Sequence, residues 1–310
     1  MNRFGSSFPG LSFLTTRREA AAPVFLPEAF LGREGLVRNM LWRLKRGESL
    51  SLCGGPKLGK TSLLLHLAWH LHHDSSSSRW SGPVGEYFDL AVEADCTRLM
   101  SRPSTADAIV LLDNCDSLVD GRFLSLSDIN TSSGRAIVFA GARTWKDRAE
   151  WGGVALSVKP IPLAVFLEKE ARQIVCQSLS REQQACALAY GGTHPYMLKL
   201  LQSEFLCRTT DCQPDHIVQT VKTSLGGFFQ RCVDQLRDAM EHQVLTYLID
   251  IGKPVNPKDV AQAVGLSNIK PIANTLCYLG LISRWIRDEE ATLSANSQLF
   301  NEWYVETMTS

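Results

Sequence analysis

The residues with the clearest chemical meaning are the eight from Gly54 to Thr61, Gly-Gly-Pro-Lys-Leu-Gly-Lys-Thr, which fit the pattern G-x-x-x-x-G-K-[ST] at every position. In this pattern the glycines let successive backbone N–H groups converge on a polyphosphate. Lys60 places a positive charge against the outer phosphates, and the Thr61 hydroxyl can bind Mg²⁺. The pattern therefore predicts a loop that holds the phosphates of a nucleotide. The residues expected to contact the nucleotide in this loop are Gly54, Gly55, Pro56, Lys57, Leu58, Gly59, Lys60, Thr61 and Ser62.

An acid at the end of a neighbouring strand is expected to complete the Mg²⁺ shell. Asp113 follows the continuous apolar run Ala108–Leu112, which is typical of a strand buried on both faces. The next residue, Asn114, is an amide, which can orient a water molecule but cannot accept its proton. Asp116 could take over that role, or it could cap the following turn. The expected metal ligands are Thr61 and Asp113, and the catalytic candidates are Lys60, Asp113 and Asn114.

A further catalytic candidate lies after the apolar run Arg135–Ala140, which predicts another strand. This run leads into Gly141, Ala142 and Arg143. Ligands bind at the carboxyl ends of the strands in open α/β sheets, so Arg143 is placed to contact a γ-phosphate and to sense whether it is present. A solvated loop arginine is the alternative.

These residues must be positioned by short apolar strands that alternate with helices. The segment Glu48–Cys53 predicts the strand before the loop, and Ser62–His73 predicts the helix after it. The other strands expected are Glu86–Leu90, Ala108–Leu112, Arg135–Ala140 and Val154–Val158, and the other helices are Leu36–Leu44 and Ala91–Met100. This alternation predicts an α/β P-loop NTPase fold, a parallel sheet with helices on both faces.

The pattern changes to helices alone after Leu163 and changes again in the last third of the chain. The first group of expected helices is Leu163–Leu179, Arg181–Ala189, Pro195–Leu206 and two shorter ones between Asp215 and Leu236. The second group is Asp238–Asp250, Pro257–Val264 and Asn268–Tyr278, followed by a two-stranded ribbon of Leu281–Arg287 and Ala291–Ser294. That order is typical of a winged helix-turn-helix. We therefore divide the chain into a flexible tail (1–28), a P-loop ATPase domain (29–160), a helical lid (161–237) and a winged-helix domain (238–310).

The composition is that of an ordinary globular protein. Lys and Arg number 32 and so do Asp and Glu, so the overall charge indicates neither a nucleic-acid nor a membrane partner. No apolar run approaches the roughly 20 residues of a membrane helix, and the first residues lack the layout of a signal peptide. The scattered cysteines contain no CxxC pair and are expected to be reduced thiols, so we expect a cytoplasmic protein. His66, His70 and His73 have no neighbouring acid or Cys cluster, so a partly exposed helix face is favoured over a metal site.

Several segments together resemble the STAND class of P-loop ATPases, in particular the archaeal-type branch close to the origin-recognition AAA+ ATPases. The segments are FLGRE, GGPKLGKT, IVLLDNCD, VFAGAR, IPLAVFLEKEA and YGGTHPYMLKLL, and the likeness covers about residues 29–310. The resemblance implies that Gly32 and Arg33 border the nucleotide base and that Arg143 is the phosphate sensor. It also implies a lid motif formed by Gly192, His194 and Pro195. The family carries an acid directly after Asp113, where this chain has Asn114, which implies slow hydrolysis.

The charge of the last third weighs against DNA binding by this segment. A winged helix that enters DNA is expected to carry Lys or Arg on its third helix and ribbon. Residues 238–310 contain 5 Lys and Arg against 9 Asp and Glu. The third helix offers Lys270, and the ribbon offers Arg284 and Arg287 beside three acids. An intramolecular or protein-contact role is favoured, and DNA binding is the alternative.

Three functions are consistent with these features. The first is a switch that binds Mg²⁺ with ATP or ADP, hydrolyses ATP slowly or on stimulation, closes its lid and winged helix, and regulates a separately encoded protein partner. The second is an ATP-dependent DNA-binding loader or transposition-type regulator. The third is a pseudo-ATPase that binds nucleotide as a structural element. A homo-oligomer is compatible with the first two, and no membrane partner is expected.

Overall fold

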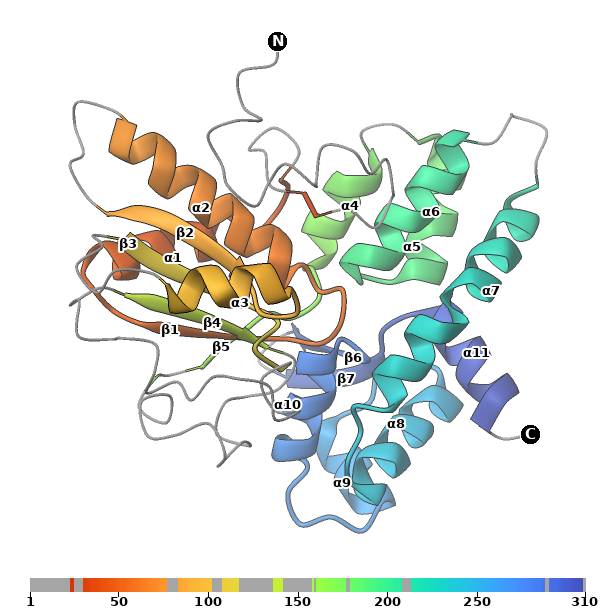
Figure 1. Cartoon of the computed structure of the whole chain (residues 1–310). Coiled ribbons are helices and arrows are strands. Elements are labelled where there is room, and N and C mark those ends of the chain that lie inside the picture. The colour runs from red at the N-terminus through yellow and green to blue at the C-terminus, as the bar shows by residue number, and fades with distance from the viewer. Residues whose placement is uncertain are drawn as a thin grey trace. The chain divides into compact units, whose positions relative to one another are not determined.

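The computed structural model describes residues 23–24, 30–76, 83–101, 108–116, 136–141, 158, 160–176, 179–207, 213–287 and 290–308. Within these ranges the chain forms two compact units. The first unit runs to Gly54 and resumes over Gly59–Leu163, and the second comprises Gly55–Leu58 and the chain from Ala164 onwards (Figure 1). The tail expected at 1–28 lies outside the described residues, apart from positions 23 and 24.

The first unit is built on a parallel sheet with the strand order β2-β3-β4-β1-β5. Its strands are β1 (Leu50–Cys53), β2 (Val84–Asp89), β3 (Ala108–Asp113), β4 (Ile137–Gly141) and β5 (Pro160–Pro162). Strands β1, β3 and β4 are buried along their whole length, as their apolar sequences require. The strand expected at Val154–Val158 falls outside the described residues, except for Val158, which is not in a strand. Within the described residues β2 and β5 form the two edges of the sheet.

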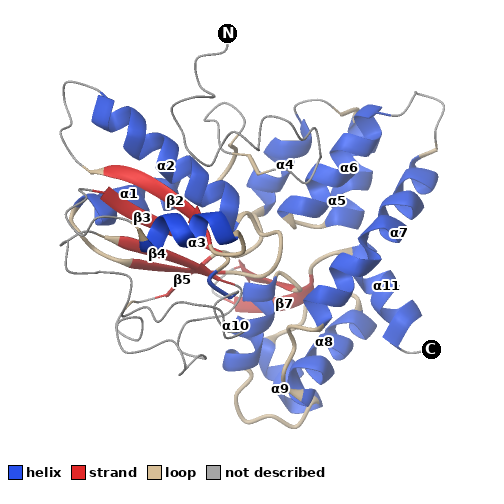
Figure 2. Ribbon diagram, viewed as in Figure 1, coloured by secondary structure: helices blue, strands red, loops and turns tan. Residues whose placement is uncertain are grey.

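Helices cover both faces of this sheet (Figure 2). They are α1 (Glu34–Lys45), α2 (Lys60–Ser76) and α3 (Glu93–Met100). Successive side chains of a strand point to opposite faces. On one face Gly85 of β2 lies against α2, where a Cβ atom would come within 3.1 Å of the Ala68 Cα. On the other face Phe88 packs with Leu99 of α3. The first unit therefore has the α/β P-loop NTPase architecture that the sequence predicts.

The second unit is largely helical. Its elements are α4 (Glu168–Cys176), α5 (Arg181–Gly191), α6 (Pro195–Cys207), α7 (Pro214–Val233), α8 (Ala239–Ile251), α9 (Pro257–Ala263), α10 (Lys270–Leu279), β6 (Ile282–Arg287), β7 (Glu290–Ala295) and α11 (Gln298–Met308). Local sequence sets several of these boundaries. Ser180 and Gln183 form a capping box at the start of α5, because each side chain bonds the other residue's backbone N–H. Asn256 caps α9 with its side chain, and Pro257 supplies the first helical residue.

Two parts of the second unit differ from the sequence prediction. The two short helices expected between Asp215 and Leu236 are one helix, α7, which continues through Gly226 and Gly227. Helix α11 was not predicted. Both differences have the same cause, because α7 and α11 pack together and bury large aromatic side chains between them. Burying such side chains outweighs the roughly 1 kcal/mol that each helical glycine costs.

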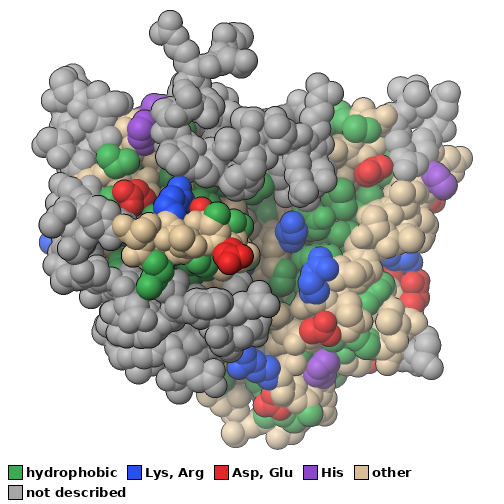
Figure 3. Space-filling view, in the orientation of Figure 1, with side chains coloured by type: hydrophobic (Ala, Val, Ile, Leu, Met, Phe, Trp, Pro, Cys, Tyr) green, Lys and Arg blue, Asp and Glu red, His purple; other side chains and the backbone are tan. Residues whose placement is uncertain are grey.

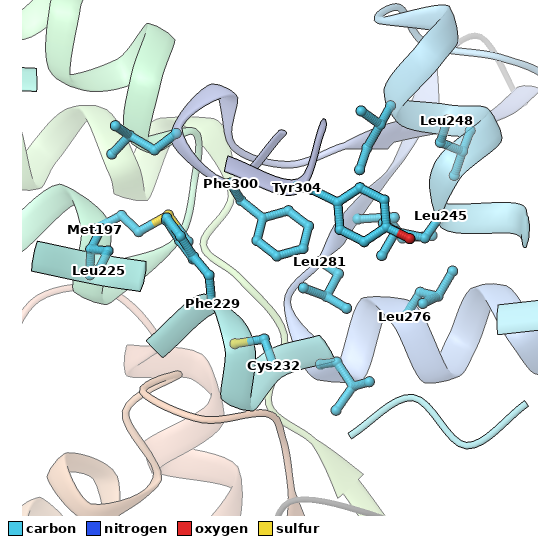
Figure 4. Close-up of a cluster of buried hydrophobic side chains, with 14 of the residues drawn as sticks. Met197, Leu225, Phe229, Cys232, Leu245, Leu248, Leu276, Leu281, Phe300 and Tyr304 are labelled. Atoms are coloured by element: carbon cyan, nitrogen blue, oxygen red, sulfur yellow. The ribbon is translucent and has the colours of Figure 1, made fainter. Parts of the chain in front are cut away.

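The core of the second unit joins its early and late helices. The Phe229 ring of α7 and the Phe300 ring of α11 meet edge to face, with 5.4 Å between their centroids. In Figure 4 Phe300 lies between Met197 and Phe229 on one side and Tyr304 and Leu245 on the other. These residues belong to one continuous hydrophobic cluster. The segments expected as lid and winged helix therefore share a core within this unit.

A buried hydrogen-bond network adds to this core. Asn296, which follows β7, accepts hydrogen bonds at Oδ1 from the Thr193 N–H, the Thr193 hydroxyl and the Ser283 hydroxyl. Its Nδ2 donates to the carbonyl oxygen of Gly280. Gly192 must be a glycine, because its φ is +60° and a Cβ atom there would overlap the Asn296 carbonyl oxygen. The turn before α6 is thus held directly against the β6–β7 hairpin.

Candidate functional site

The loop that the sequence predicts to bind phosphate runs from the end of β1 to the start of α2. The Gly54 N–H donates to the Gly141 carbonyl at the end of β4, over 3.1 Å, which fixes the start of the loop to the sheet. A Cβ atom on Gly54 would lie 2.8 Å from the Leu163 carbonyl oxygen, so no larger residue fits there without a backbone shift. Lys57 and Gly59 have φ values of +59° and +91°, which turn the chain back toward the helix. The loop therefore delivers its backbone to the N-terminus of α2, where orphan N–H groups favour an anion.

Lys60 is the first residue of α2 and reaches back across the loop. Its Nζ donates a hydrogen bond to the Gly54 carbonyl oxygen over 2.8 Å. An ammonium group has three donors, so this bond leaves capacity for a phosphate oxygen on the loop. The position suits the role that the sequence assigns to Lys60.

The middle of the loop belongs to the second unit. There the Gly55 N–H donates to the Tyr278 carbonyl over 2.5 Å, so this predicted phosphate donor bonds a protein carbonyl in this structure. The Lys57 Nζ lies 5.2 Å from the centroid of the Tyr196 ring, within the range of a cation–π contact. Leu58 is fully buried and lies close to Gly280. The side chains of Lys57 and Leu58 therefore hold this part of the loop in place, while the backbone of Gly55–Leu58 is expected to bind phosphate.

Thr61 and Asp113 meet at the adjoining end of the sheet. The Thr61 hydroxyl donates to Asp113 Oδ2 over 2.5 Å, and the Tyr87 hydroxyl donates to the same oxygen over 3.0 Å. Asp113 is fully buried. Burial raises the pKa of its carboxyl group, and hydrogen bonds from Thr61 and the Asn114 N–H, with the charge of Lys60, oppose that rise. Burial next to this carboxylate also raises the pKa of the Tyr87 phenol, so Tyr87 stays a neutral donor.

These oxygen atoms fit a Mg²⁺ ion. Mg²⁺ prefers oxygen ligands and usually binds through one or two protein groups together with phosphates and waters. The Thr61 hydroxyl and the Asp113 carboxylate supply such a pair, already in contact beside the loop. A buried carboxylate whose charge is disfavoured by desolvation would also gain from a nearby cation. Tyr87, which holds Asp113 in place, was missed in the sequence, because nothing in its strand indicates which side chain it faces.

Asn114 bonds to Asp89, an acid that nothing in the sequence singles out as part of the site. Its Nδ2 donates to Asp89 Oδ1 over 2.8 Å, and its own φ is +51°. Asp89 ends β2 and stands opposite Asp113 in the parallel register. Its position at the end of a predicted strand was the one signal in the sequence that could have indicated a place near Asp113, because the carboxyl ends of adjacent parallel strands meet at one edge of the sheet. Asp116 lies beside the end of β4. Its Oδ1 atom is 3.1 Å from the position that a Cβ atom on Gly141 would take.

Arg33 also reaches the loop. Gly32 and Arg33 both have positive φ values, +73° and +65°, at the entry to α1. A Cβ atom on Gly59 would lie 3.1 Å from an Arg33 guanidinium nitrogen, so this side chain borders the glycine of the loop. The Ser62 hydroxyl, by contrast, accepts a hydrogen bond from the Val24 N–H over 3.1 Å. Arg33 is therefore next to the predicted nucleotide site, and Ser62 serves a backbone contact in this structure.

The remaining predicted residues lie in other places. His194 is buried in the second unit, in a small pocket lined also by Met197, Cys232 and Phe300. Pro195 begins α6 directly after it. Arg143, the predicted phosphate sensor, falls outside the described residues.

Further expectations concern metals, thiols and membranes. His66 and His70 contact each other through their Nε2 atoms at 3.2 Å, and the part of the chain that the structure describes contains no cluster of three or more metal-binding side chains. Every cysteine in the same ranges is a free thiol. No described helix combines the length and the apolar character needed to cross a membrane.

No model of a known protein family matches this chain, and no curated protein does either. Solved structures share its fold. The ORC1 protein of Aeropyrum pernix, in complex with DNA, superposes with a TM-score of 0.51 at 14% identity over 94% of this chain and 97% of that one. A Walker-type ATPase of Pyrococcus abyssi gives a TM-score of 0.56 at 12% identity over 92% and 99%. The ORC2 protein of A. pernix, in ADPNP–ADP complexes, gives 0.50 at 12% identity over 95% and 99%. At these identities the likeness concerns the fold.

Proposed function

We propose that this chain, which has the fold of origin-recognition-like P-loop ATPases, is a nucleotide-operated switch that binds ATP or ADP with Mg²⁺. The contact between the Thr61 hydroxyl and the buried Asp113 carboxylate, beside a loop that fits the phosphate-binding pattern at every position, carries this proposal. A bound Mg²⁺ ion would neutralise charge on the phosphates. Thr61 and Asp113 would hold it, Lys60 would contact the outer phosphates, and Arg33 would border the nucleotide.

We propose further that the second unit reads the nucleotide state. Its helices α8 to α10 and the β6–β7 hairpin follow in the order of a winged helix-turn-helix, and they share one hydrophobic core with the helices of the predicted lid. His194 and Pro195 would serve as the lid motif and Arg143 as the phosphate sensor, as the family resemblance implies. The regulated target would be a separately encoded protein or a second copy of this chain.

Nucleotide binding is the first test. Titration with a fluorescent ATP analogue, with Mg²⁺ and then with EDTA, should give Mg²⁺-dependent binding for the wild type. Lys60→Ala should weaken it at least about tenfold, because one charged hydrogen bond of about 1.5–3 kcal/mol is lost. The matched control is Lys253→Ala, which removes an exposed lysine from the second unit. Equal affinities for wild type and Lys60→Ala would overturn the proposal.

A DNA-binding loader or regulator is the second candidate. The ORC1 protein that shares this fold was solved in complex with DNA, which favours this alternative. Against it, acids outnumber bases in residues 238–310, and basic and acidic side chains of the described residues are interspersed on the face shown in Figure 3. A protein that neutralises several phosphates loses DNA affinity steeply as salt rises. No binding at low salt with ATP present would eliminate this candidate.

A pseudo-ATPase is the third candidate, and Asn114 is the observation that favours it. An amide at this position cannot accept the proton of an attacking water. Comparing ATP turnover in the wild type and Lys60→Ala separates the two cases. A switch with slow hydrolysis should show turnover that depends on Lys60, whereas a pseudo-ATPase should show none. Asn114→Glu tests in addition whether an acid at this position raises turnover.

A further inference from the structure

Two polar side chains meet where β2 and β3 end. Asp89 is the last residue of β2, and Asn114 directly follows Asp113, the last residue of β3. The parallel register places Asp89 opposite Asp113, so the two chain ends lie side by side. Asn114 Nδ2 donates to Asp89 Oδ1 over 2.8 Å. The pair therefore lies next to the two groups that we assign to Mg²⁺.

Asp89 is held in place independently of Asn114. Its Oδ1 also accepts a hydrogen bond from the Ala91 N–H over 2.9 Å. Its backbone N–H donates to Asp95 Oδ2 over 2.8 Å, and Asp95 forms an ion pair of 3.1 Å with Arg98 on α3. The carboxylate thus presents a fixed acceptor to the Asn114 side chain.

This acceptor determines how the Asn114 amide is oriented. An ionised carboxylate only accepts hydrogen bonds, so it binds the NH₂ end of an amide and leaves the carbonyl end pointing away. The backbone of Asn114 is fixed as well, because its N–H donates to Asp113 Oδ1 over 2.9 Å. Among the residues that the structure describes, no protein group donates a hydrogen bond to Asn114 Oδ1. The amide therefore offers one acceptor in a defined direction.

We propose that Asp89 is a positioning residue: it fixes the Asn114 amide so that its carbonyl oxygen accepts a hydrogen bond from the water that attacks the γ-phosphate. The acid that the family places after Asp113 is thus replaced by an amide whose orientation is set by an acid one strand away. The amide orients water without taking its proton, which is consistent with slow hydrolysis. This inference rests on the proposed function.

Replacing the two side chains tests the inference. Asp89→Ala removes the oxygen that accepts from Asn114 Nδ2, so that the Asn114 amide can take either orientation, and should lower ATP turnover about tenfold, the effect of losing one hydrogen bond in the transition state. Its affinity for the fluorescent ATP analogue should stay within about twofold of wild type, because Asp89 contacts no ligand. Asn114→Asp places two carboxylates together and should lower the melting temperature of the nucleotide-free protein by about 3 °C or more.

The double variant Asp89→Ala with Asn114→Asp removes one of the two carboxylates. It should recover the melting temperature lost in Asn114→Asp. Glu93→Gln is the matched control, because it removes an exposed acid from α3 near Asp89 without touching the pair. Rescue by the double variant separates positioning from general damage, since two damaging changes would otherwise add.

The outcomes are distinguishable from those of the proposed function. A wild type that binds no Mg²⁺-nucleotide overturns the proposed function itself. A wild type that binds and turns over ATP through Lys60, with Asp89→Ala unchanged in turnover, overturns only the role of Asp89. A double variant that melts no higher than Asn114→Asp also overturns it, because then the two side chains are not in contact. Nucleotide binding without any Lys60-dependent turnover overturns it as well, because then no attacking water is oriented.

Discussion

Asn296→Ala tests how strongly one buried amide holds the second unit together. The side chain makes four hydrogen bonds: Oδ1 accepts from the Thr193 N–H at 3.3 Å, the Thr193 hydroxyl at 2.8 Å and the Ser283 hydroxyl at 2.7 Å, and Nδ2 donates to the Gly280 carbonyl at 3.2 Å. Asn296, Thr193 and Ser283 are 8%, 6% and 4% exposed. Alanine would leave all four partner groups without this side chain.

The expected cost follows from these contacts. A buried hydrogen bond contributes about 1 kcal/mol net to the free energy of unfolding, so the loss of four bonds would lower it by about 4 kcal/mol. Hydroxyl groups can rotate to other acceptors and water can enter the space, which reduces the expected loss to about 2–4 kcal/mol. For a chain of this size 1 kcal/mol corresponds to about 2–4 °C, so the melting temperature should fall by about 4–16 °C.

Calorimetry and urea unfolding of the nucleotide-free protein measure this loss. Gln298→Ala is the matched control, because it removes an exposed amide from α11 whose bond to Glu302 lies at the surface. The control should change the free energy of unfolding by less than about 0.5 kcal/mol. A loss below about 1 kcal/mol for Asn296→Ala would refute the reasoning that this network couples the turn before α6 to the β6–β7 hairpin.

Three further predictions concern other parts of the chain. Gly85→Ala should destabilise the first unit by about 1–3 kcal/mol in urea unfolding, because its Cβ atom would lie 3.1 Å from the Ala68 Cα, a backbone atom of α2. Tyr87→Phe should lower the free energy of unfolding of the nucleotide-free protein by about 1 kcal/mol, since the buried Asp113 loses one donor; an unchanged value would contradict this. Burial raises the pKa of the Cys277 thiol to about 11. Cys277 should therefore stay protonated at pH 8 and react with iodoacetamide much more slowly than the exposed Cys207, and equal labelling by mass spectrometry would disprove it.

The parts of the site that the sequence predicted are those encoded by residues close together in the chain. The role expected of the loop from Gly54 to Thr61 follows from the spacing of its residues, and the apolar run before Asp113 marks the end of its strand. The four strands β1 to β4 were located to within a few residues for the same reason. The role of Arg143 as a phosphate sensor stays a prediction, because this residue lies outside the described residues.

Packing over long sequence distances explains what was missed. Helix α7 continues through Gly226 and Gly227, because α11 covers its aromatic side chains from a distant part of the chain. Local propensity favours a break at two adjacent glycines, and tertiary contacts override it.

The sequence by itself predicted a phosphate-binding loop after the first strand, and it determined that Asp113 ends a neighbouring strand and that the amide Asn114 follows it. It determined these because each is a short pattern of residue types. The tertiary structure alone decided which side chains face one another: Tyr87 with Asp113, Asp89 with Asn114, and Thr193 with Asn296. The physical reason is that each pair is formed by strand register or by packing between elements far apart in the chain, neither of which is encoded in the residues next to the pair.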